Sequence, residues 1–199
     1  MWASTLRCSR SSAVHRPDGF TAVELVLVLV VLGVLVLLIA PRINVARIRT
    51  DAAMKGIGTT LLTAQRQAVT RQHDVIVTFD LANRSLHIHE DGNNNGAVDA
   101  GERRRAVALE EGVVFGLGGA TPRPMGPGPV TYQKLIGGQP ALVFHRDGSA
   151  SEAAGFYLTS ARAAASGAHP GDTRAIETEP GTGRVNWFSY TPPTWQRGF

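Results

Sequence analysis

The chain has 199 residues, of which 43% are hydrophobic, and a single cysteine. This length suits one globular domain with an appendage, and one cysteine excludes an internal disulfide. The formal net charge is +4, but six of the twenty basic residues and only two of the sixteen acidic ones precede residue 51, which leaves fourteen of each in the remainder. The globular part is therefore neutral, so its bulk charge does not favour a nucleic-acid partner.

Residues 20–40 form an apolar run of 21 residues that contains a single charge, Glu24. A helix rises about 1.5 Å per residue, so this run is long enough for the roughly 30 Å hydrocarbon core of a bilayer. The preceding residues, 1–19, are polar and basic, and basic flanks stay on the cytoplasmic side of a membrane. We therefore predict a membrane-spanning helix whose N-terminus is cytoplasmic.

Two simpler interpretations of this run fit it less well. A secretory signal peptide needs small residues just before its cleavage site, whereas Leu38 occupies that place and Pro41 follows Ala40. A plain membrane anchor explains the hydrophobicity but not Glu24, because an ionisable group inside a bilayer costs several kcal/mol and usually has a functional partner. The carboxylate therefore needs an explanation of its own.

The residues around Glu24 supply that explanation. The sequence Gly19-Phe20-Thr21-Ala22-Val23-Glu24 resembles the processing site of type IV pilins and type II secretion pseudopilins. The resemblance implies that a prepilin peptidase cuts between Gly19 and Phe20 and methylates the new amino terminus. It also implies that Glu24 is the assembly carboxylate, which pairs with an amine of a neighbouring subunit.

Helical periodicity resumes after Pro41, which matches a proline common in pilin helices. A proline inside a helix kinks it, so we predict a kink there and an amphipathic second half over residues 42–73. Apolar residues recur at intervals of three or four and form a stripe of Ala53, Ile57, Leu61, Ala64 and Ala68. We interpret this stripe as the face that packs on the core.

After His73 the pattern changes to short β-type runs separated by turn sequences such as Asp147-Gly148, as in antiparallel sheets. The predicted fold class is therefore α+β, with a long, kinked N-terminal helix packed on antiparallel β-sheet. Residues 116–129 and 161–173 are predicted loops, and residues 190–199 a loose tail. The predicted strands are Val75–Asp80, Arg84–Glu90, Arg104–Leu109, Val113–Leu117, Val130–Ile136, Ala141–Arg146, Gly155–Ser160, Arg174–Glu179 and Arg184–Ser189.

The order of these features, from residue 20 to about residue 190, is similar to that of the GspH/FimT group of minor pilins and pseudopilins. The supporting sequences are Asp91–Glu102, Phe144–Gly148 and Thr182–Val185. The resemblance implies a pilin-like structural subunit, not an enzyme, of a type II secretion pseudopilus or type IV pilus. Its implied partners are prepilin peptidase, other pilins or pseudopilins and the bacterial inner membrane, with the globular domain in the periplasm. The expected divisions are a leader at 1–19, a transmembrane half-helix at 20–41, an amphipathic half at 42–73, a β-rich globular domain at 74–190 and a C-terminal tail at 191–199.

Residues 91–102 match the spacing of a calcium-binding loop, with oxygen-bearing side chains at alternate positions and a glycine at the turn. However, the preceding segment looks like a strand rather than the helix of an EF-hand, and three arginines that follow at once oppose a cation. The alternative is a polar hairpin loop whose Asn and Gly residues form turns. Calcium is thus the one candidate cofactor, with ligands Asp91, Asn93, Asn95, Asp99 and Glu102.

A DNA-binding minor pilin for DNA uptake in natural transformation is the alternative function. DNA-uptake members of the FimT group contact phosphates through a Gly-Arg-x-Arg motif, of which Gly183-Arg184-Val185-Asn186 keeps only the first arginine. Strand packing and a solvated hairpin edge explain the remaining candidates without DNA. These candidates are Arg103, Arg104 and Arg105 for phosphates and Trp187, Phe188, Tyr190 and Trp195 for stacking on bases.

No catalytic residue is predicted. Ser149 and Asp147 are near His145 in sequence, but no nucleophile elbow surrounds the serine. His87 and His89 alternate on one strand and could join His145 around a metal, although histidines on a solvated strand face are much commoner.

Overall fold

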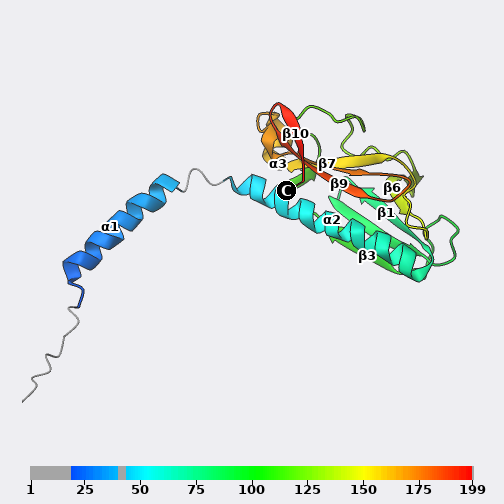
Figure 1. The fold of residues 1–199 in the computed structure, drawn as a ribbon, viewed down its shortest axis with the longest axis horizontal. Helices are drawn as coiled ribbons and strands as arrows, with labels where there is room; N and C mark the ends of the chain where they lie inside the picture. The colour runs from blue at the N-terminus through cyan, green and yellow to red at the C-terminus, as the bar shows by residue number, and fades with distance from the viewer. Residues whose placement is uncertain (1–18, 40–43, 199) are drawn as a thin grey trace, which may run out of the picture. The chain divides into compact units, whose positions relative to one another are not determined.

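The computed structural model describes residues 19–39 and 44–198 (Figure 1). The chain divides into two compact units, Met1–Ile43 and Asn44–Phe199. The first unit contributes one described helix, α1 (Ala22–Ile39). The predicted kink at Pro41 lies outside the described residues. Within those residues, no helix combines the length and the apolar composition needed to cross a membrane.

The second unit begins with α2 (Val45–Arg71), a helix of 27 residues. Asn44 caps its N-terminus, because the side-chain oxygen accepts a hydrogen bond from the Arg47 backbone N–H at 3.1 Å and satisfies one free donor of the first turn. Gln72 follows the last residue of the helix and caps it in the left-handed conformation, with a φ of 57°. The predicted apolar stripe is confirmed, since all of its members are buried: Ala53, Ile57, Leu61, Ala64 and Ala68.

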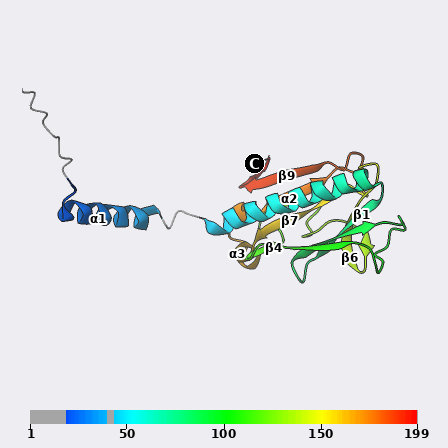
Figure 2. The same cartoon turned by 90° about the horizontal axis from the view of Figure 1, so that it is seen from below.

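The described residues of this unit also form two five-stranded antiparallel sheets (Figures 1 and 2). The first has the order β3–β2–β1–β6–β5, and the second has the order β10–β9–β8–β7–β4. The strands of the first sheet are β1 (Asp74–Asp80), β2 (Ser85–Asp91), β3 (Arg104–Ala108), β5 (Leu135–Ile136) and β6 (Gln139–Phe144). Those of the second are β4 (Val113–Phe115), β7 (Ala154–Ser160), β8 (Arg174–Thr178), β9 (Val185–Thr191) and β10 (Thr194–Arg197).

The main hydrophobic core lies where α2 meets both sheets. Leu61 of α2, Phe79 of β1 and Phe156 of β7 are fully buried in it, and Phe79 stacks on Tyr132 with ring centroids 5.2 Å apart. Burial of each large apolar side chain contributes about 1.5–3 kcal/mol, so packing can hold the unit without a disulfide. The predicted α+β class, with a helix packed on antiparallel sheet, is confirmed, as are eight of the nine predicted strands to within two residues at each end.

The predicted loop at 161–173 contains two short helices, α3 (Ala161–Ser166) and the 3₁₀ helix η2 (Pro170–Asp172). Ser160 caps α3 by accepting a hydrogen bond from the Ala163 backbone N–H at 3.2 Å, and Gly167 ends it with a φ of 66°. The loop prediction is wrong here because a capped run of alanines forms a short helix readily.

The prediction of a loose C-terminal tail is also wrong. Residues Thr194–Arg197 pair with β9 as the edge strand β10, with Trp195 opposite Tyr190. The Trp195 indole N–H donates a hydrogen bond to the Thr121 carbonyl at 2.8 Å. This contact lies 74 residues away in the sequence, so no local pattern could indicate it.

The one predicted strand that is not confirmed, Val130–Ile136, is mostly irregular, and only its last two residues belong to β5. The Glu152 carboxylate accepts hydrogen bonds from the backbone N–H groups of Gln133 at 2.9 Å and Lys134 at 3.1 Å. In a strand these two N–H groups would bond to a neighbouring strand. Here the Glu152 side chain accepts their hydrogen bonds in its place.

Candidate functional site

The predicted processing and assembly residues lie at the start of α1. Thr21 caps this helix, since its Oγ1 accepts a hydrogen bond from the Glu24 backbone N–H at 3.2 Å, and Glu24 lies in the first turn. The partial positive charge of a helix N-terminus favours a carboxylate there. Gly19, Phe20 and Glu24 are all exposed. Their roles in processing and assembly stay predictions.

Apolar side chains cover every side of α1. From Phe20 to Leu37, each large apolar side chain is exposed, by between 46% for Val28 and 79% for Val23. A helix that is hydrophobic all round is normally buried in a protein core or a membrane. Each such side chain left in water forgoes about 1.5–3 kcal/mol of burial free energy. Among the described residues of its own unit, nothing buries these side chains.

The Asn-rich loop joins β2 to β3 and is held by its own acidic side chains. Asp91 is buried and accepts hydrogen bonds from the backbone N–H groups of Asn95 at 3.1 Å and Gly96 at 2.7 Å. Glu102 closes the other end of the loop, because one of its oxygens accepts a hydrogen bond from the Gly92 N–H at 3.1 Å. The loop is thus ordered by carboxylates bonded to its own backbone.

Asp99 connects the middle of the loop. It accepts hydrogen bonds from the side-chain amides of Asn93 at 3.0 Å and Asn95 at 2.6 Å, and these bonds hold the pKa of Asp99 below its usual value. Among the described residues, no group of three or more His, Asp or Glu side chains is arranged to hold a metal ion. A polar hairpin loop accounts for this geometry without a cation, and calcium binding stays a prediction.

The four arginines predicted for DNA lie in two places. Arg103–Arg105 are exposed at β3, the edge of the first sheet, and Arg184 is exposed in the turn between β8 and β9. Gln65 of α2 donates a hydrogen bond to the carbonyl of Thr182 in that turn at 2.8 Å, whereas Gln67 lines a hollow with Arg103 and Arg105. Residues two apart on a helix face nearly opposite directions, so α2 separates the two groups of arginines.

The aromatic residues near the C-terminus pack within the protein. Phe188 and Tyr190 are buried, and Trp195 lies against Tyr190 with ring centroids 5.0 Å apart. The Arg123 guanidinium covers the Phe188 ring at 3.5 Å from its centroid, a cation–π contact. Strand packing therefore describes these residues, and DNA binding stays a prediction.

The side chains considered for catalysis do not form a relay. The Ser149 hydroxyl donates a hydrogen bond to Asp147 at 2.6 Å, and His145 Nδ1 lies 2.8 Å from Asp74 Oδ2. Serine and histidine thus have different carboxylate partners. Among the described residues, His145 and Ser149 are joined by a backbone hydrogen bond, from the His145 N–H to the Ser149 carbonyl at 2.9 Å, and by no side-chain hydrogen bond.

His87 and His89 do lie on one face of β2, with ring centroids 6.3 Å apart. His87 is within 3.3 Å of the Ser85 hydroxyl. Burial lowers the pKa of His89, and its Nδ1 has no hydrogen-bond partner among the described residues. His145 is engaged by Asp74 instead, so the three histidines do not gather.

Two polar contacts that hold α2 in place could not be predicted from the sequence. Buried Arg174 pairs with Asp51 of α2, and Asp172 accepts a hydrogen bond from the Asn44 side chain at 3.2 Å. The partners are 123 and 128 residues apart in sequence, so no spacing could reveal them. A hollow beside α2 had one local signal: small residues recur every fourth position as Gly56, Thr60 and Ala64.

A long helix packed on antiparallel sheets, with a separate apolar helix before it, defines a pilin-like class of protein. The family described as "Type II transport protein GspH" matches residues 53–181, and the chain belongs to this family. This confirms the family predicted from the sequence.

Two solved structures of the minor pseudopilin EpsH, from the type II secretion system of Vibrio cholerae, are similar to this chain. Each is 18% identical with a TM-score of 0.43; one match covers 70% of this chain and 94% of the other, and the second covers 71% and 96%. No curated protein matches the chain.

Proposed function

We propose that this protein is a minor pseudopilin: a structural subunit that prepilin peptidase processes and that joins a type II secretion pseudopilus through its hydrophobic helix. The observation that carries the proposal is α1, which exposes apolar side chains on all sides and holds one carboxylate, Glu24, in its first turn. The second unit has its own core, and in this proposal the apolar side chains of α1 contact lipid and then other subunits. Membership of the GspH family supports the pseudopilus as the place of those contacts.

In this proposal the bacterial inner membrane covers the apolar run before assembly, with the N-terminus cytoplasmic and the globular unit periplasmic. Cleavage after Gly19 frees the amine of Phe20, which is then methylated. In the filament, neighbouring helices replace the lipid, and Glu24 faces the amine of a neighbouring subunit. An unpaired charge in such surroundings costs several kcal/mol, and pairing with the amine offsets much of that cost.

Replacing Glu24 tests this mechanism. Glu24→Gln and Glu24→Ala keep the helix apolar, so both variants should reach the membrane at wild-type levels. Both lose the charge that pairs with the amine, and we expect the assembled fraction to fall at least about tenfold, as loss of about 1.4 kcal/mol predicts. Filament assembly and secretion of the system's substrates are measured in the same cells.

The matched control is Glu111→Gln, which removes an exposed carboxylate from the globular unit and should assemble normally. Wild-type assembly by Glu24→Gln would refute the pairing mechanism and, with it, the main support for the proposed function.

A further inference from the structure

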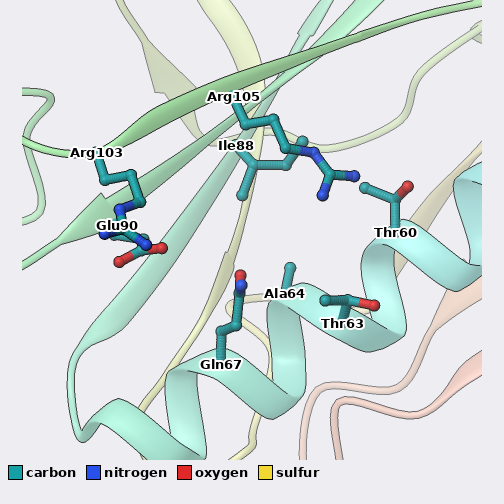
Figure 3. Close-up of a pocket in the computed structure, with 8 residues that line it drawn as sticks. All are labelled: Thr60, Thr63, Ala64, Gln67, Ile88, Glu90, Arg103 and Arg105. Atoms are coloured by element: carbon teal, nitrogen blue, oxygen red, sulfur yellow. The ribbon is translucent and has the colours of Figure 1, made fainter.

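Two adjoining hollows separate α2 from β3, and together they form what we call the α2–β3 groove. Each has a volume of about 230 Å³, and both are lined by Thr60. Figure 3 shows the end at which Arg105 extends from β3 toward Thr60, with Gln67 of α2 beside the same space. Gly56 and Val107 line the other end.

One wall of this groove is a strand with a free edge. β3 pairs with β2 alone among the described strands. The Glu90 N–H donates to the Arg103 carbonyl at 3.0 Å, and the Leu109 N–H donates to the Arg84 carbonyl at 2.8 Å. Along an antiparallel pair, residues whose backbone groups bond to the partner strand alternate with residues whose backbone groups point away from it. The backbone N–H and C=O groups that point to the free edge are therefore those of Arg104, Ala106 and Ala108.

The same alternation sorts the three arginines. Arg103 and Arg105 face the groove, where both line the hollow of Figure 3, and Arg104 faces the opposite side of the sheet. In the described part of the chain neither Arg103 nor Arg105 forms an ion pair. The nearby carboxylate of Glu90 is paired with Arg71, so this end of the groove has an excess of positive charge.

The helical wall leaves room for a side chain. A Cβ added at Gly56 would meet no atom within 4 Å, and the groove beside it is lined by Ile57, Val107 and Leu109. The groove thus has an apolar end and a basic end along one exposed strand edge. This pattern fits an extended peptide, whose backbone pairs with the edge while alternate side chains enter the groove.

We propose that the α2–β3 groove binds an extended acidic segment of another subunit, which adds to β3 as a further strand and places a carboxylate between Arg103 and Arg105. Only the identity of the partner as a filament subunit rests on the proposed function. The chemistry, an acidic β-strand with apolar residues toward the Gly56 end, rests on the groove itself.

Nucleic acid fits this surface less well than a peptide. A phosphate backbone is bound by arginines that share one face, whereas Arg104 lies on the other face from Arg103 and Arg105. The free strand edge offers both donors and acceptors in alternation, which another strand satisfies and a row of phosphate acceptors does not.

A binding experiment with the purified full chain in detergent micelles tests the groove. The probe is a fluorescent synthetic peptide with threonine at every second position; the positions between are glutamate in one half and valine in the other. A matched peptide has glutamine in place of glutamate. By anisotropy, the glutamate peptide should bind at least about fivefold more tightly, as two exposed charge pairs predict.

Variants locate the site. Arg105→Glu should weaken binding of the glutamate peptide at least about fivefold, and the matched Arg104→Glu, on the other face, less than about twofold. Ala106→Pro should abolish binding, because proline is tolerated at an edge position that faces solvent but cannot donate to an added strand. Gly56→Leu, which fills the groove, should also abolish it. Unchanged circular dichroism and unfolding midpoints show that the variants fold.

Equal binding of the two peptides, or equal losses in Arg104→Glu and Arg105→Glu, would overturn the proposal. The proposal would also be overturned if a labelled single-stranded oligonucleotide bound the wild-type protein but not the Arg105→Glu variant. That result would assign the groove to nucleic acid. In cells, Arg105→Glu should reduce filament assembly and Arg104→Glu should not. Normal assembly by Arg105→Glu would remove the groove as a subunit contact and leave the proposed function, tested at Glu24, in place.

Discussion

Gly56 and Gly58 lie two residues apart in α2 and have different surroundings. A Cβ at Gly56 would meet nothing within 4 Å, whereas a Cβ at Gly58 would come within 2.7 Å of the Trp187 ring. The sequence alone predicts the same cost for both, up to about 1 kcal/mol of helix stability each. The structure separates a glycine that borders an open groove from one that admits a rigid ring against the helix.

The first prediction at this scale concerns stability. Gly56→Ala should raise the free energy of unfolding by up to about 1 kcal/mol, since alanine favours helix and nothing blocks it. Gly58→Ala should lower it by about 1–3 kcal/mol, because the methyl group forces the Trp187 ring to move. Urea unfolding of the purified protein measures both. Shifts of the same sign in the two variants would contradict the packing described.

At the scale of elements, the N-terminus of α2 is tied to the segment that holds α3 and η2. Asp172 is 2% exposed and accepts hydrogen bonds from the Ser160 hydroxyl at 2.6 Å and from Arg162 Nε at 3.0 Å. It also accepts one from the side-chain amide of Asn44, the residue that caps α2. The Asp172 carboxylate thus links the N-terminus of α2 to the segment that connects β7 to β8 in the second sheet.

This arrangement predicts a pH dependence. Burial raises the pKa of Asp172, but hydrogen bonds from Arg162 and Ser160 outweigh burial and hold that pKa below its usual value of 3.8. Because the folded pKa is the lower one, the ionised carboxylate stabilises the fold above the unfolded pKa. That contribution is lost as pH falls through the folded pKa. Asp172→Asn should therefore flatten the pH dependence of the unfolding free energy below about pH 5 and cost about 2 kcal/mol at neutral pH.

Urea unfolding at a series of pH values measures the effect. Glu111→Gln removes an exposed carboxylate and should keep the wild-type slope. A wild-type slope in Asp172→Asn would mean that another acidic group governs the acid range.

The elements differ in how far local sequence determines them. The stripe of α2 and eight strands were predictable because periodicity and turn residues are local signals. β10 was not, since its order depends on Trp195 reaching Thr121. The motif from Gly19 to Glu24 is contiguous and could be identified, whereas the α2–β3 groove exists only because strand order leaves β3 at an edge. Contacts between distant segments, which sequence spacing does not encode, account for the difference.

At the scale of the whole molecule, much of the basic character belongs to the N-terminal segment. Residues 1–19 contain three arginines and one aspartate, so the proposed cut removes +2 of the formal net charge of +4. The cut also creates the amine that the proposed pairing with Glu24 requires. In this proposal, processing changes both the charge of the chain and its ability to assemble.

Gly19→Val tests this dependence. A branched side chain at the last leader residue should block cleavage, so the chain keeps its leader, Phe20 is not methylated, and no amine is available to a neighbour's Glu24. We expect the precursor to accumulate and filament assembly to be lost. Mass spectrometry of the intact protein reports the leader and the methyl group together.

Gly33→Val is the matched control, because it makes the same change within α1, where an added side chain meets nothing within 4 Å. This variant should be cleaved and methylated normally. Normal cleavage of Gly19→Val would place the processing site elsewhere and leave Glu24 without its proposed partner.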